Sequence, residues 1–204
     1  SSPESKVISI SIKDRSAILP GGHLSDGSYW YDYSSGKFIT STYFKTELPK
    51  WLQSFNESKN ASKYLAKWDL LYPKTNYTSA DISPYEVILG GKTSATFPYD
   101  FKEMSKIANN GNQLFTISPF ANELLTDLAM EAMSREQLGL DIKTDMLCIS
   151  YSTPDIAGHA FGPYSLEMED MYARLDRQIE KLLSHLDSRY GKDGYVVFLT
   201  ADHA

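Results

Sequence analysis

The chain has 204 residues, with 20 Lys and Arg against 26 Asp and Glu, a formal charge of −6 at pH 7 and 42% apolar residues. That apolar fraction is too high, and that charge too small, for a disordered chain, and a chain of this size buries roughly 70% of its unfolded surface on folding. The negative balance argues against a nucleic acid polymer as partner, and the single cysteine, Cys148, excludes an internal disulfide. No apolar run approaches the ~20 residues of a membrane span, so the composition predicts a globular domain without one.

Three strands are predicted in the first part of the chain. Isoleucines alternate with serines over residues 6–12, which is the period of a strand, and the small serines leave room for a helix to pack closely on that face. Residues 29–33 and 37–42 are separated by a short turn containing Gly36, which predicts a hairpin.

Residues from about 24 to 117 are expected to form an inserted, aromatic-rich segment. The tryptophans Trp30, Trp51 and Trp68 all fall within it, and we expect them to form a packing cluster of their own. Short helices are predicted within residues 49–68. The frequent Pro, Gly, Ser, Thr and Asn of residues 70–117 predict little regular structure there.

Regular elements return in the last part of the chain. Ser118 and Pro119 are typical of a helix start, and apolar spacing predicts a helix over 119–136. A buried strand over 145–151, a long amphipathic helix over 165–188 and another strand over 195–200 follow. This order predicts a parallel strand pair with a right-handed crossover, and hence an α/β fold with an incomplete, mostly parallel sheet and flanking helices.

The end of the chain suggests that more protein follows. Residues 195–200 run directly from a predicted core strand into Ala201, Asp202 and His203, and natural domains rarely end at such a point. We therefore expect residues 1–204 to be a single incomplete domain, the central portion of a longer protein.

Charged residues follow three of the predicted strands. Lys13-Asp14-Arg15 follows the first strand, Asp155 and His159 follow the strand over 145–151, and Asp202-His203 follows the last. In a parallel sheet, binding groups gather beyond the carboxyl ends of the strands, so we expect the three clusters to share one crevice.

The residue types in these clusters suit metal-assisted phosphate chemistry. Asp155 with His159, and Asp202 with His203, each offer a carboxylate and an imidazole, the mixture that zinc favours. Pro154 and Gly158 predict a loop around the first pair. Two metal ions ~3.5–4 Å apart stabilise the attacking and leaving oxygens of phosphoryl transfer. Lys13 and Arg15, on one side of their strand, are placed to neutralise phosphate oxygens.

Each cluster also has a structural interpretation. Asp155 suits the cap of a turn before a helix, Asp-His pairs occur by chance, and Lys-Asp-Arg is typical of a solvated strand end. A non-catalytic module, whose Asp and His residues only cap loops, is therefore an alternative hypothesis. The metal hypothesis is favoured by the joint placement at strand ends of two of the four histidines in the chain.

The motif Pro154-Asp155-x-x-Gly158-His159-x-x-Gly162-Pro163, followed by Thr200-Ala-Asp202-His203, resembles the alkaline phosphatase superfamily, in particular its nucleotide pyrophosphatase/phosphodiesterase branch. The segment 11–23 is similar to the bacterial phosphate-irrepressible alkaline phosphatases of that superfamily. The resemblance implies two zinc ions, one held by Asp155 and His159 and one by Asp202 and His203, with Lys13 and Arg15 on the phosphoryl group.

The resemblance also implies hydrolysis through a covalent phospho-enzyme. The family takes its nucleophilic Thr or Ser and one Asp ligand from upstream segments and a third His from downstream, and this chain contains no counterpart to them. No catalytic nucleophile is therefore assigned here, and we expect the 204 residues alone to be inactive and their zinc sites empty or partly occupied. The family implies a periplasmic or secreted location, although the chain shows no signal peptide.

The substrate expected from the resemblance is a small-molecule phosphate ester. A monoester is favoured over the alternative, a phosphodiester or nucleotide pyrophosphate, because the extra negative charge of a monoester needs the cationic contact that Lys13 and Arg15 provide.

Overall fold

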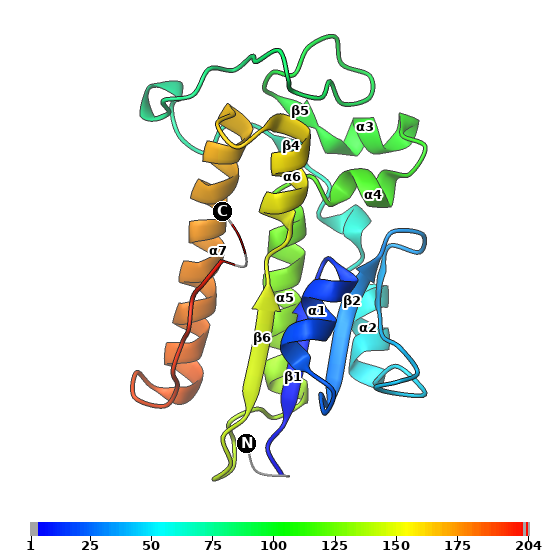
Figure 1. Ribbon diagram of the computed structural model, residues 1–204, viewed down its shortest axis with the longest axis vertical. Helices are drawn as coiled ribbons and strands as arrows, with labels where there is room; N and C mark the ends of the chain where they lie inside the picture. Colours follow the sequence, from blue (N-terminus) through cyan, green and yellow to red (C-terminus); the bar gives the residue numbers. More distant parts are fainter. Residues whose placement is uncertain (1–3, 202, 204) are drawn as a thin grey trace.

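A four-stranded sheet in the order β3-β2-β1-β6 forms the centre of the molecule, for which a computed structural model describes residues 4–201 and 203 (Figure 1). β1 (Val7–Ser11) pairs in parallel with β2 (Gly27–Asp32) on one side and β6 (Met146–Ser150) on the other, and β3 (Lys37–Ile39) is antiparallel to β2. The predicted α/β class, mostly parallel sheet and β2–β3 hairpin are confirmed.

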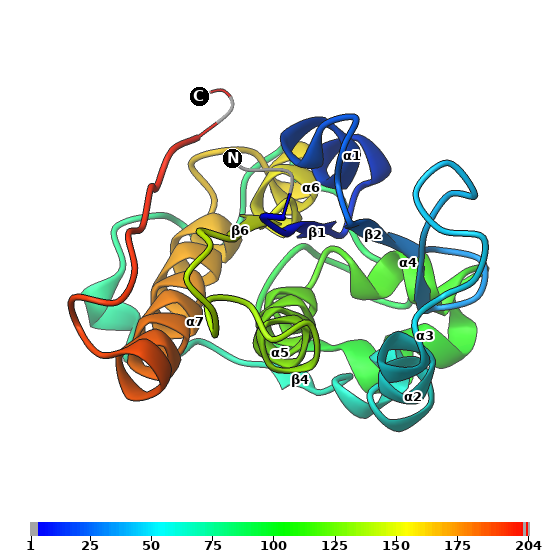
Figure 2. The same cartoon turned by 90° about the horizontal axis from the view of Figure 1, so that it is seen from below.

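The alternation of β1 determines how the sheet is covered. Its isoleucines are fully buried in the core that includes the leucines of α5 (Phe120–Arg135), whereas Ser9 and Ser11 are buried on the opposite face. α1 (Asp14–Gly21) covers that second face (Figure 2). A Cβ added to Gly21 would lie 3.0 Å from the Cβ of Ser9, so the small residues allow the predicted close approach.

Two helices follow β6 and lead to the end of the chain. α6 (Thr153–Phe161) begins directly after the strand, and α7 (Leu166–Tyr190) lies beside α5. The Ser165 hydroxyl caps α7 by accepting a hydrogen bond from the backbone N–H of Met168 at 3.3 Å. None of the helices in the described residues combines the length and the apolar character needed to cross a membrane.

Residues 50–115 hold more regular structure than their composition predicts. The elements are α2 (Lys50–Ser58), 3₁₀ turns at Ala61–Lys63 and Lys74–Asn76, the antiparallel pair β4 (Lys67–Trp68) and β5 (Tyr99–Asp100), α3 (Phe101–Ile107) and α4 (Gly111–Phe115). The expectation of little regular structure was therefore wrong for the last part of 70–117. Side-chain caps at Asp100 and Asn110 start the two short helices, a local signal that the overall composition conceals.

The three tryptophans do not form one cluster. Trp68 is fully buried among aromatic rings, with Tyr99 at 5.7 Å and Phe161 at 6.2 Å between ring centroids. Trp51 instead packs edge to face on Tyr29 of β2 at 5.7 Å. The inserted segment at about 24–117 remains a proposal, and β2 and β3, near its start, belong to the central sheet.

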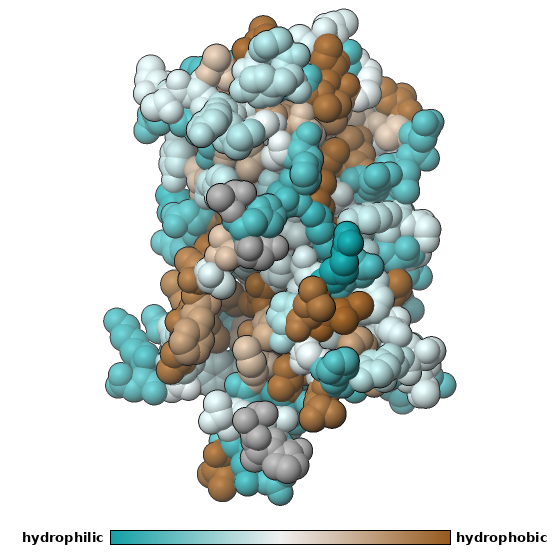
Figure 3. All heavy atoms as spheres, in the orientation of Figure 1, coloured by the Kyte–Doolittle hydropathy of each residue, from teal (hydrophilic) through white to brown (hydrophobic). Residues whose placement is uncertain are grey.

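The predicted strand over residues 195–200 is not formed, and this prediction was wrong. After Gly191, at φ +74°, the segment runs past α7, and Val196, Phe198 and Leu199 are 79%, 90% and 79% exposed. Figure 3, in the same orientation as Figure 1, shows apolar surface in the region of α7. β6 is consequently an edge strand of the described sheet and only partly buried, and the parallel pairs are β1–β2 and β1–β6 instead.

Candidate active site

The predicted site residues gather at the carboxyl ends of the neighbouring strands β1 and β6. Ser11 is paired with Ser150, so the two strands end at the same level. Lys13 is the N-cap of α1 and Arg15 lies in the first turn of that helix. The expectation that Lys13 and Arg15 share one side of a strand was wrong because β1 ends at Ser11 and α1 begins at Asp14.

The segment that carries Asp155 and His159 is helical, so the predicted loop was also wrong. Pro154 lies in the first turn of α6, where its missing N–H removes no helical hydrogen bond. Gly158 is accommodated within the helix. Since Asp155 and His159 are four residues apart on α6, their side chains lie on the same face.

Four predicted residues from three segments converge at this point. Lys13 Nζ forms an ion pair with Asp155 Oδ2. Asp155 Oδ1 lies 3.5 Å from Nε2 of His159 and 3.3 Å from Nε2 of His203. Asp202, the remaining predicted ligand, lies outside the described residues.

The charge of Asp155 is stabilised by its surroundings. Partial burial acts to raise the pKa of Asp155, but the hydrogen bond and charge of Lys13, together with His159 and His203, outweigh it and hold the pKa below its ordinary value. The first turn of α6 also favours a negative charge. Because both oxygens of Asp155 lie against side chains of other turns or segments, a role confined to capping α6 does not account for its contacts.

The imidazoles of this cluster face solvent. The His159 side chain is 79% exposed and that of His203 is 59% exposed, against 22% for Asp155. The cluster is therefore open on one side, where a ligand can approach.

Arg15 lies beside the cluster rather than in it. Its side chain is exposed and lines, with Lys13, a cavity of about 310 Å³ next to the end of β2, where Trp30 and Tyr33 contribute half-buried aromatic rings. The two residues predicted to bind phosphate, Lys13 and Arg15, therefore line the same cavity.

Two serines that the sequence patterns did not indicate, Ser11 and Ser152, contact the backbone of Lys13. The backbone N–H of Lys13 donates to Ser11 Oγ at 3.2 Å and to Ser152 Oγ at 3.3 Å. The available signal was a serine shortly before each charged residue, with Ser11 two positions before Lys13 and Ser152 three positions before Asp155.

The donor set fits zinc chemically. Carboxylate oxygen and imidazole nitrogen are common zinc ligands, and here two Nε2 atoms lie within 3.5 Å of one carboxylate oxygen. Among residues 4–201 and 203, no three Asp, Glu, Cys or His side chains are already arranged as a complete metal-binding group.

Comparison with known proteins identifies the family. The profile of the type I phosphodiesterase / nucleotide pyrophosphatase family matches residues 16–204. The chain belongs to this family. It is therefore a member of the alkaline phosphatase superfamily, as its motifs predict.

The similar proteins include alkaline phosphatases. Over 202 residues, 98% of this chain, it is 45% identical to alkaline phosphatase PhoV of Synechococcus elongatus and 43% identical to alkaline phosphatase PafA of Elizabethkingia meningoseptica. The chain spans only 36% and 37% of the lengths of these relatives.

Two crystal structures of PafA have the same fold as this chain. Wild-type PafA and a variant with four substitutions each give a TM-score of 0.88 over 94% of this chain and 37% of theirs, at 40% and 38% identity. In the variant, alanine replaces a lysine and an arginine two positions apart.

Proposed function

We propose that the protein to which this chain belongs is a two-zinc phosphomonoesterase that works through a covalent phospho-enzyme. The observation that carries the proposal is the convergence of Asp155, His159 and His203 beside Lys13, at the strand ends of a chain homologous to alkaline phosphatases.

Each residue of the cluster has a proposed role. Asp155 and His159 would hold one zinc ion, and Asp202 and His203 the second. Bound zinc supplies positive charge that stabilises phosphoryl oxygens. Lys13 and Arg15 bind and orient the phosphoryl group, Arg15 through its planar guanidinium. Support for these two comes from the PafA variant, in which the replaced lysine and arginine have the same spacing.

The nucleophile is proposed to be a Thr or Ser outside residues 1–204, and the location of the whole protein to be periplasmic or secreted. Without the nucleophile, the 204-residue chain should show no turnover and weak or absent zinc binding. Robust hydrolysis of a phosphate monoester by the purified 204-residue chain would contradict this assignment.

The ratio of monoesterase to diesterase activity tests the substrate class. We expect the full-length protein to have a much higher kcat/KM for phenyl phosphate than for a matched phenyl diester, because the dianionic monoester gains more from Lys13 and Arg15. The diester or nucleotide pyrophosphate alternative predicts the reverse preference.

Zinc titration tests the metal sites against the non-catalytic alternative. We expect the full-length protein to bind two zinc ions, and Asp155→Ala and His203→Ala each to lower the affinity by at least about tenfold, since each removes a ligand. Unchanged zinc affinity in both variants would favour a structural role for these residues.

A further inference from the structure

Ser152 is the N-cap residue of α6, yet its side chain makes no cap hydrogen bond. A capping serine has an extended backbone, which directs its oxygen toward the N–H groups of the first turn. Ser152 instead has φ −82° and ψ −3°, a helical conformation that turns its hydroxyl away from that turn. The hydroxyl is therefore available for a different contact.

That contact lies on the neighbouring strand. Ser152 Oγ is 3.1 Å from Ser11 Oγ and accepts a hydrogen bond from the backbone N–H of Lys13 at 3.3 Å. Ser11 and Ser152 are 0% and 7% exposed, so these bonds are shielded from water.

The directions of these hydrogen bonds follow from the donors present. Ser11 Oγ donates its proton to the Ser150 carbonyl at 2.9 Å, so it acts as acceptor toward both Ser152 and Lys13. Ser152 must then donate to Ser11. The result is a directed chain from the Lys13 backbone, through two hydroxyls, to the end of β6.

We propose that Ser152 is a positioning residue for Lys13. By tying the Lys13 backbone to the start of α6, it sets where Lys13 Nζ lies relative to Asp155, which stands on the first turn of the same helix. The proposal rests on the proposed function, in which Lys13 binds the phosphoryl group. Small displacements of a phosphate-binding group lower the reaction rate because the reacting atoms must be held at a close and fixed distance.

The test uses the full-length protein with Ser152→Ala. We expect kcat/KM for phenyl phosphate to fall about tenfold, and competitive inhibition by inorganic phosphate to weaken in parallel, because the phosphate anchor is displaced. Ser152→Thr retains the hydroxyl and should restore at least half of the lost activity. Ser11→Ala breaks the same chain from β1 and should give a similar loss.

Ser165→Ala is the matched control. Ser165 is the N-cap of α7, and its hydroxyl caps that helix without contacting Lys13 or Asp155. We expect Ser165→Ala to lower the melting temperature while leaving kcat/KM and phosphate inhibition within about twofold of wild type. An activity loss in Ser165→Ala as large as that in Ser152→Ala would overturn the positioning role.

A double-mutant cycle separates this inference from the proposed function. In a Lys13→Ala background, Ser152→Ala should lower kcat/KM by less than about twofold, because the residue it positions is gone. An equal loss in both backgrounds would overturn the inference alone. If Lys13→Ala itself left kcat/KM unchanged, the proposed phosphate anchor would fail instead.

Discussion

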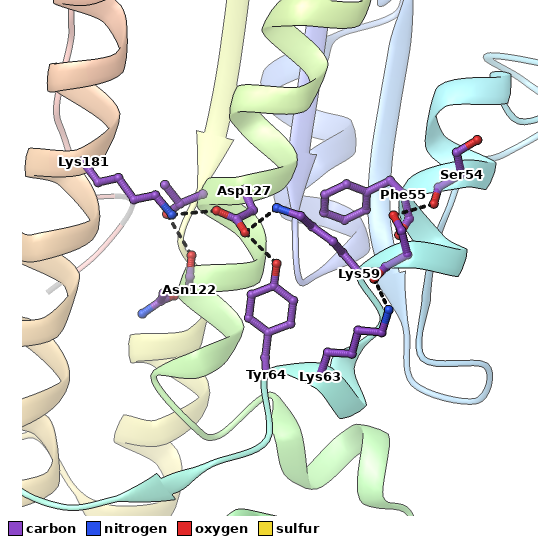
Figure 4. A network of polar contacts seen from close by, with 10 residues as sticks. Ser54, Phe55, Lys59, Lys63, Tyr64, Asn122, Asp127 and Lys181 are labelled. Atoms are coloured by element: carbon purple, nitrogen blue, oxygen red, sulfur yellow. Dashed lines mark hydrogen bonds and ion pairs between the residues drawn. The ribbon is translucent and has the colours of Figure 1, made fainter.

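Two aspartates on helices that are consecutive in the chain, Asp127 of α5 and Asp155 of α6, show how a structural carboxylate differs from a candidate metal ligand. Asp127 of α5 accepts from Lys59 at 2.8 Å, Lys181 at 2.7 Å and Tyr64 at 2.6 Å (Figure 4). Lys59 is the C-cap residue of α2, Lys181 lies in α7 and Tyr64 lies between α2 and β4, so one side chain ties several parts of the molecule together.

The partners of Asp155 are of a different kind. At neutral pH, the ammonium and phenol groups around Asp127 donate hydrogen bonds to its carboxylate. The imidazoles of His159 and His203, when neutral, also carry an electron pair that can bind a metal ion. Asp127 is 13% exposed beneath its donors, while the imidazoles beside Asp155 are mostly exposed. The pKa values of Asp127 and Asp155 are both held below their ordinary value. At Asp127, burial acts to raise the pKa, but the hydrogen bonds from Lys181, Lys59 and Tyr64 outweigh it. The nature and exposure of the partners, rather than the charge of the carboxylate, therefore distinguish the two sites.

The largest expected effect is that of Asp155→Asn on activity. We expect kcat/KM of the full-length protein to fall at least about 100-fold, because a charged ligand is lost, while the free energy of unfolding of the metal-free protein changes by less than about 1 kcal/mol. Steady-state kinetics and urea unfolding measure the two quantities. If Asp155→Asn lowered stability without lowering activity, Asp155 would have the same structural role as Asp127, and the proposed difference between them would be wrong.

A third carboxylate, Glu167 of α7, extends the comparison to a buried site with few donors. Its side chain accepts from Tyr99, and burial raises its pKa to about 7, with further contributions from Glu86 and Asp81. Its Oε2 has no hydrogen-bond partner among the described residues. The folded state holds the proton of Glu167 more tightly than the unfolded state does. The contribution of this proton to the free energy of unfolding is therefore complete below the ordinary pKa near 4.5 and is lost as the pH rises to about 7.

Glu167→Gln should therefore stabilise the protein at high pH. At pH 8 we expect a free energy of unfolding about 1–3 kcal/mol above wild type, since the neutral amide still accepts from Tyr99 without burying a charge. At pH 5 the difference should shrink. Urea unfolding of both proteins at the two pH values cancels the effects of other titrating groups, and a difference independent of pH would refute the prediction.

Of the three substitutions, Asp127→Asn should have the smallest effect, and only stability should change. We expect the free energy of unfolding to fall by about 1–2 kcal/mol, because two lysines and Tyr64 lose a charged acceptor, although both lysines are about half exposed. The value of kcat/KM at a permissive temperature should remain within about twofold of wild type. A large activity loss in the correctly folded variant would show that Asp127 is not purely structural.

Local patterns predicted the elements whose boundaries depend on near neighbours. The Ile/Ser alternation of β1, the turn between β2 and β3 and the apolar spacing of α5 and α7 are properties of short windows, and all four were confirmed. The strand expected over 195–200 failed because an apolar run becomes a strand only where a neighbouring strand pairs with it. The loop expected at α6 failed because Pro154 is compatible with the first turn of a helix.

The sequence by itself determined which charged residues follow β1 and β6, because strand length and the residues after it are read along one stretch of chain. Only the tertiary structure decided that Lys13 pairs with Asp155, that His159 and His203 lie against the same oxygen, and that the Ser152 hydroxyl supports Lys13 instead of capping α6. The contacts of Lys13 depend on the parallel register that brings Ser11 opposite Ser150, and a register between strands far apart in sequence cannot be read from either strand alone.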